Sequence, residues 1–103
     1  MFRRKRFGEL IKMQLSVFEI DHADRLEALR AALAEYRASD RYDAEERYGD
    51  YADEIDWAAE ELAEMRDTYA ATIDPDLVDQ YEQEFSKVVH KRHPAIAVIL
   101  DTL

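Results

Sequence analysis

The chain has 103 residues, of which 48% are hydrophobic and 37% are charged, and its formal net charge is -10 at pH 7. This length suits one domain with a single core, and the hydrophobic fraction is far above that of chains that stay disordered. Cysteine is absent, which excludes disulfides, thiolate metal sites and cysteine nucleophiles. Only two Gly and two Pro occur, so the composition predicts an all-α fold.

Positive and negative charges are concentrated in different parts of the chain. Residues 1–12 carry five Lys or Arg and one acid, whereas residues 40–84 carry seventeen acids and three Arg. An acidic body repels nucleic-acid phosphates, so only the basic N-terminal tail, residues 1–6, suits nucleic acid. Glu9 and Lys12 interrupt the segment that a secretory signal would need, and no window reaches the ~20 apolar residues of a membrane span. We therefore expect a soluble cytoplasmic protein.

The first predicted helix covers residues 7–39. Apolar side chains recur there at spacings of three and four, and His22 completes the series. This periodicity is typical of an amphipathic helix. The series is Phe7, Ile11, Leu15, Phe18, Leu26, Leu29, Leu33 and Tyr36.

Three further helices are predicted, over residues 43–73, 75–92 and 94–101. Each of the two prolines marks the start of a helix, because proline at the first helical position sacrifices no hydrogen bond. The expected fold is an antiparallel helical hairpin of two long helices plus a third helix and a short C-terminal helical tail. The narrow apolar stripes would leave the edges of the paired helices uncovered. We therefore expect several copies of the chain to associate as an oligomeric helix bundle, most simply a dimer.

The position of the first turn has two solutions. The apolar series lapses at residues 39–43, where Asp43 with Glu46 three residues later matches a capped helix start. The only glycine in this region is Gly49, which offers a later turn, and an uninterrupted rod would need a partner chain along its length. We favour the early turn.

One Glu-x-x-His pair is the clearest hint of chemistry. If the chain turns near residue 41, an antiparallel hairpin sets His22 at the level of Glu61, which lies on the flank that faces it. Glu19, one turn before His22, lies on the same side of the first helix. Glu19, His22 and Glu61 would then form one cluster of metal donors.

In this respect the trio resembles part of a ferritin-like di-iron site of the kind built across a dimer of short helical hairpins. The resemblance covers only these residues, and the chain has one Glu-x-x-His where such families have two. It implies iron or another divalent metal, bound at a subunit interface. The residues alone also allow His22 to fill a half-buried position, hydrogen-bonded to Glu19 or a partner helix, or to form a pH-dependent contact between subunits.

Two other groups of polar residues are expected to be solvated. His90 and His93 have cations beside them, which disfavour a bound metal, so we place both on the surface. Glu61-Leu-Ala-Glu64 is similar to the acidic pair with which all-α nucleotide pyrophosphohydrolases hold magnesium, but the second pair of such enzymes is missing. A solvated acidic face accounts for these two glutamates.

Aromatic and basic residues indicate surfaces for protein partners. Trp57 lies on the polar side of its helix near Tyr48 and Tyr51, where it either anchors a partner or packs against the third helix. The run Arg3-Arg4-Lys5-Arg6 suits an acidic partner, anionic lipid or RNA, and we favour contact with the acidic region of a second subunit.

The leading hypothesis is a non-enzymatic assembly or adaptor subunit that binds protein and associates with itself. The serines show no triad-like arrangement that would favour an enzyme. The alternative is a metal-binding protein with Glu19, His22 and Glu61 as ligands at a subunit interface.

Overall fold

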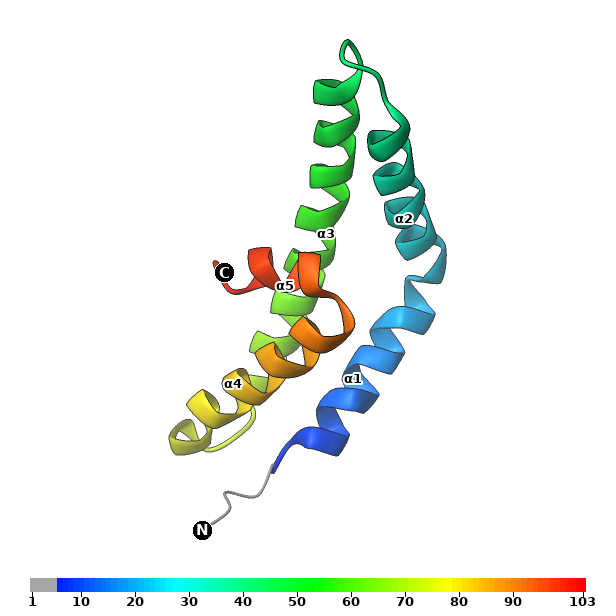
Figure 1. Ribbon diagram of the computed structural model, residues 1–103. Coiled ribbons are helices and arrows are strands. Elements are labelled where there is room, and N and C mark those ends of the chain that lie inside the picture. Colours follow the sequence, from blue (N-terminus) through cyan, green and yellow to red (C-terminus); the bar gives the residue numbers. More distant parts are fainter. Residues whose placement is uncertain (1–5) are drawn as a thin grey trace.

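The computed structural model describes residues 6–103, and this part of the chain is all-helical, as the composition predicted. It forms an elongated body with extents of 53 × 25 × 23 Å (Figure 1). None of its helices has both the length and the hydrophobicity that crossing a bilayer requires. The helices are α1 (Gly8–Asp21), α2 (Ala23–Ala38), α3 (Ala44–Ala70), α4 (Pro75–Arg92) and α5 (Pro94–Leu100).

The first long helix is not continuous, which corrects the prediction of one helix over residues 7–39. His22 leaves the helical conformation at φ -117° and ψ 27° and separates α1 from α2. The helical hydrogen bonds on both sides of His22 persist, from its own N–H to Phe18 and from Leu26 to its carbonyl. The apolar series runs through position 22 without a gap, so periodicity alone gave no sign of the bend (Figure 1).

The chain reverses direction between α2 and α3, at residues 39–43. The carboxylate of Asp40 accepts hydrogen bonds from the backbone N–H groups of Tyr42 and Asp43, at 2.9 and 3.0 Å. Asp43, the residue expected to cap the next helix, makes no side-chain capping bond. Gly49 lies inside α3, so the alternatives of a turn there or of one unbroken rod are wrong.

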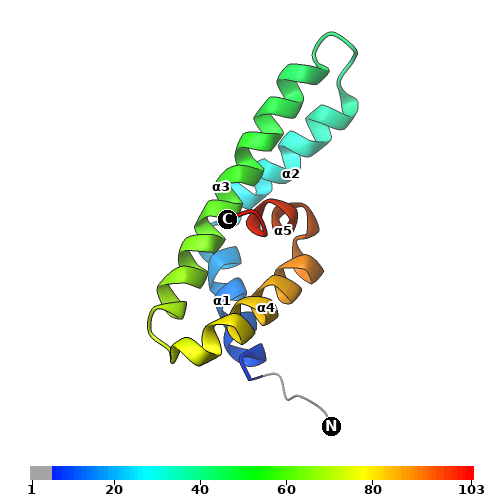
Figure 2. The ribbon, with the colours of Figure 1, turned by 90° about the vertical axis from the view of Figure 1, so that its left-hand side faces the viewer.

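The core lies where the C-terminal half of α3 meets α1, α4 and α5. Helix α5 packs against both α3 and α4, and α1 packs mainly on α4 (Figure 2). Asp74 accepts a hydrogen bond from the N–H of Asp76 at 2.9 Å, and Pro75 opens α4, so the expected stop and restart is formed there. The largest fully buried side chains are Tyr81, Phe18, Phe85, Ile11, Leu15, Leu62, Leu100 and Val89.

The other end of the molecule is a two-helix arm, residues 30–54, which none of the other described helices covers (Figures 1 and 2). The buried side chains stop at Leu29 on α2 and resume at Ile55 on α3, so the arm contains no buried residue. Within the arm, tyrosine rings meet edge-on, with ring centroids 5.3 Å apart for Tyr36 and Tyr48 and 6.5 Å apart for Tyr48 and Tyr51, and Arg47 on α3 pairs with Glu35 on α2 at 3.5 Å.

Candidate functional site

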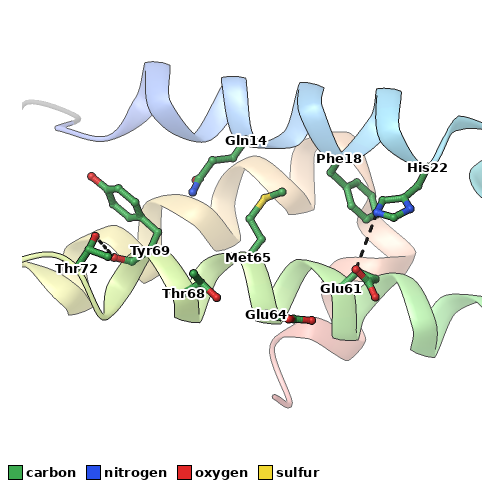
Figure 3. Close-up of a pocket in the computed structure, with 9 residues that line it drawn as sticks. All are labelled: Gln14, Phe18, His22, Glu61, Glu64, Met65, Thr68, Tyr69 and Thr72. Carbon is green, nitrogen blue, oxygen red and sulfur yellow. Dashed lines mark hydrogen bonds and ion pairs between the residues drawn. The ribbon is translucent and has the colours of Figure 1, made fainter.

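An open groove of about 510 Å³ runs between α1 and α3 (Figure 3). On the α3 side it extends from Glu61 to Tyr69, a length of about 12 Å along the helix axis, and Thr72 lines it just beyond the end of α3. In Figure 3, Gln14, Phe18 and His22 of α1 and Met65 of α3 point into the space between the two helices, whereas Glu64 lies on the side of α3 turned away from α1. The lining residues are Gln14, Phe18, His22, Glu61, Glu64, Met65, Thr68, Tyr69 and Thr72.

The middle and one end of the groove are largely apolar and rest on the core. Met65 and Tyr69 are half-buried, and the Tyr69 ring lies 4.8 Å from that of the fully buried Tyr81. The Tyr81 hydroxyl donates a hydrogen bond to Gln14 Oε1 at 3.0 Å. Burial raises the pKa of Tyr81 to about 12, so its hydroxyl remains a donor and fixes the orientation of the Gln14 amide.

The opposite end of the groove is acidic. His22 Nε2 and Glu61 Oε2 lie 3.9 Å apart across it, each with more than a third of its side chain exposed. Glu64, one turn further along α3, is exposed. The two glutamates therefore place two carboxylates at this end of the groove.

The structure does not bring the three expected metal donors together. It places His22 next to Glu61, but Glu19 turns to the other side of α1, where its carboxylate contacts His93 Nε2 at 2.7 Å and Arg92 Nη1 at 3.4 Å. Glu19 does so because α4 packs on α1, a contact that no helical periodicity reveals. Residues 6–103 contain no group of three His, Asp or Glu side chains that could hold one metal ion.

The two C-terminal histidines have different surroundings. His93 is half-buried at the break between α4 and α5, which corrects its expected surface position. His90 is exposed, and its Nε2 lies 2.6 Å from Asp101 Oδ2. The hydrogen bond from His90, together with one from Ser86 at 2.8 Å, lowers the pKa of Asp101. Each histidine thus joins a carboxylate from another segment.

Trp57 is covered from the junction of α1 and α2 rather than from α4. Its ring lies 5.1 Å from that of His22 and 6.3 Å from that of Phe18, and the Arg25 guanidinium lies 4.1 Å above it. Arg25 also pairs with Glu54 at 3.1 Å. The signal that sequence reasoning missed is this cation above an indole, which needs the bend at His22 to bring the residues together.

Of the remaining residues predicted to bind partners, those that the structure describes lie on the arm and just before α1. Tyr48 is 54% exposed and Tyr51 half-buried, both on the arm, and the nearby Tyr42 is 91% exposed at its tip. Arg6 is exposed before α1. Residues 3–5, Arg3, Arg4 and Lys5, lie outside the described residues.

No protein-family model, curated protein or solved structure matches the chain. Its function therefore has to be inferred from the geometry and charge of its own surfaces.

Proposed function

We propose that this protein is an assembly or adaptor subunit, which uses the groove between α1 and α3 to bind a segment of a protein partner. The observation that carries the proposal is the composition of the groove: an apolar stretch around Met65 and Tyr69 that ends at two carboxylates, Glu61 and Glu64. A segment with apolar side chains next to a Lys or Arg complements both parts.

The form of the groove favours a polypeptide over a small molecule. Small-molecule sites enclose most of the ligand surface, whereas this groove is open along its whole length between two helices. Between two and three turns of α3 line it, which matches the length over which a helix or an extended segment presents successive side chains. Aromatic and methionine side chains such as Tyr69 and Met65 are the residue types that anchor such contacts.

A first experiment identifies the partner. A photo-crosslinking amino acid at Thr68, an exposed groove residue, is compared in the native host with the same amino acid at Asp56, an exposed position elsewhere on α3. The proposal expects a protein that is captured from position 68 and not from position 56. Identical captures from both positions would remove the groove as a binding site.

A second experiment tests the chemistry with the identified partner in purified form. Glu64→Lys reverses one charge in the groove, and Asp56→Lys makes the same change outside it. Calorimetric titration should show an affinity about tenfold weaker for Glu64→Lys, because one attractive charge pair becomes repulsive. Asp56→Lys should bind like the parent chain. Equal affinities for both variants would contradict the proposal.

A further inference from the structure

Helix α1 carries a second apolar stripe on the side that faces away from the core. Met13 is 65% exposed, Val17 46% and Ile20 75%, and Leu10, which is half-buried and also packs against the core, continues the series at its N-terminal end. At 100° per residue these four positions fall within about 80° of the helix circumference. The outer stripe therefore consists of Leu10, Met13, Val17 and Ile20.

The outer stripe has the spacing of a helix-pairing seam. Its members are separated by three, four and three residues, the alternation with which two helices interlock side chains. Single exposed apolar residues are ordinary on protein surfaces, but three exposed apolar side chains in a row on one short helix, with the half-buried Leu10 beside them, form a contiguous patch of the kind that marks an interaction site.

We propose that the outer stripe is the surface through which two copies of this chain associate, with their α1 helices antiparallel. The outer stripe does not line the groove, so association through it goes beyond the proposed function and does not depend on what binds in the groove.

Charge complementarity selects a second copy in this orientation. Arg6 lies just before the N-terminal end of α1, and Asp21 and Asp24 lie around its C-terminal end, all three exposed. Two acids near the N-terminal end of α1 are already engaged within the chain: Glu9 pairs with Lys12 at 3.6 Å, and Glu84 accepts a hydrogen bond from the N–H of Phe7 at 3.1 Å. An antiparallel pair sets the basic end of each copy against the acidic end of the other, so each attraction occurs twice by symmetry.

The register of the pair follows from the positions in the stripe. The spacing is symmetric about position 15, so a two-fold axis there places Leu10 against Ile20 of the second copy and Met13 against Val17. The same axis brings Arg6, which precedes α1, toward the end of the second copy's α1 where Asp21 and Asp24 lie. A parallel pair would instead set like charges at the same level, which is destabilising.

An anionic membrane fits the stripe less well than a second copy does. A bilayer that accepted all four apolar side chains would also bring Asp21 and Asp24 close to anionic headgroups. The acidic segment 40–84 adds to this repulsion. A second copy turns the same two carboxylates into attractive partners.

Analytical ultracentrifugation of the purified full chain tests the dimer. Because α1 is only about 21 Å long, the contact is smaller than standard interfaces, and we expect a dissociation constant of roughly 10–100 μM. The double variant Met13→Glu, Val17→Glu should remain monomeric up to about 300 μM, a shift of at least tenfold. Val98→Glu is the matched control: Val98 is 61% exposed on α5, and this variant should dimerise like the parent.

Charge exchange tests the antiparallel orientation and keeps the proposal falsifiable if the double variant fails to fold. Arg6→Glu and Asp24→Arg should each weaken the dimer about fivefold to tenfold, and the two changes combined in one chain should restore it. No restoration would exclude this register. Because the chain lacks cysteine, a mixture of Leu10→Cys and Ile20→Cys chains should form mixed disulfides in preference to symmetric ones.

Two outcomes would overturn the inference. One is a parent chain that stays monomeric across the concentration range. The other is a parent chain that dimerises equally well with glutamate at positions 13 and 17. Binding to vesicles of phosphatidylglycerol and phosphatidylcholine that depends on Met13 and Val17, with no dimer in solution, would assign the stripe to lipid instead. Glu64→Lys should leave sedimentation unchanged, which separates this result from failure of the groove proposal.

Discussion

Tyr81 links three helices through one ring and one hydroxyl. From α4 its ring packs against Phe7 before α1 and against Tyr69 on α3, with centroids 5.3 and 4.8 Å away. Its hydroxyl donates to Gln14 on α1. The side chain is fully buried and supports two residues that line the groove, Gln14 and Tyr69.

The raised pKa of Tyr81 makes the stability of the fold sensitive to alkaline pH. In the folded chain this pKa is about 12 against an ordinary value of 10.0, so the stabilisation is complete below pH 10 and is lost as the pH rises through about 12. The full shift corresponds to about 3 kcal/mol. At pH 7, the unfolding free energy of Tyr81→Phe should be about 1 kcal/mol lower than that of the parent, because the hydrogen bond to Gln14 is missing. Between pH 9 and 11.5, however, the unfolding free energy of the variant should decline less than that of the parent.

Urea unfolding at a series of pH values measures this difference. Tyr42→Phe is the control, because Tyr42 is 91% exposed and should retain the pH dependence of the parent. An equal decline of unfolding free energy in Tyr81→Phe and in the parent would show that burial of this hydroxyl does not govern the alkaline limb.

At the scale of helices, local patterns located most of the secondary structure. Apolar spacing, proline and the lapse at residues 39–43 depend on neighbours along the chain, and α3 to α5 lie near the predicted ranges. The bend at His22 has no such local mark, since the apolar series passes through it. The proximity of His22 to Glu61 follows from hairpin geometry alone. The contact of Glu19 with His93 does not follow from hairpin geometry, because it depends on how α4 packs across α1.

The arm should be the part of the described chain that opens most easily. It has no buried side chain between Leu29 and Ile55, and segments with few buried apolar contacts open at a free energy well below that of global unfolding. Hydrogen exchange should therefore show amides of residues 44–52 exchanging at least tenfold faster than those of residues 58–66, both within α3.

A pair of leucine substitutions provides a second measure of the arm. Leu33→Ala, at a half-buried position in the arm, should cost less than about 1.5 kcal/mol of unfolding free energy. Leu62→Ala, where the side chain is fully buried, should cost about 2–5 kcal/mol. Equal costs, or uniform protection along α3, would mean that the arm is held by contacts that the single chain does not contain, such as those with another copy.

At the scale of the whole molecule, the net charge of -10 acts on an elongated body, in which helices α3 and α4 carry most of the acids. Exposed ion pairs such as Arg25 with Glu54 contribute about 0–1 kcal/mol each and weaken in salt. Residues 40–84 carry seventeen acids but only three Arg. The repulsion among these acids also weakens in salt, which stabilises the fold. Because acids far outnumber cations in that segment, we expect the repulsion to dominate.

Raising sodium chloride from 0.02 to 0.5 M should therefore increase the unfolding free energy by about 1 kcal/mol, or roughly 5 °C in Tm. Protein concentrations of a few micromolar keep the chain below the expected dimer affinity, so the change reports on the single chain. Asp56→Lys removes one repulsive charge from α3 and should raise Tm at low salt while reducing the response to salt. A Tm that falls with salt would instead mean that the ion pairs between helices outweigh the repulsion, since both contributions are screened and only their difference is observed.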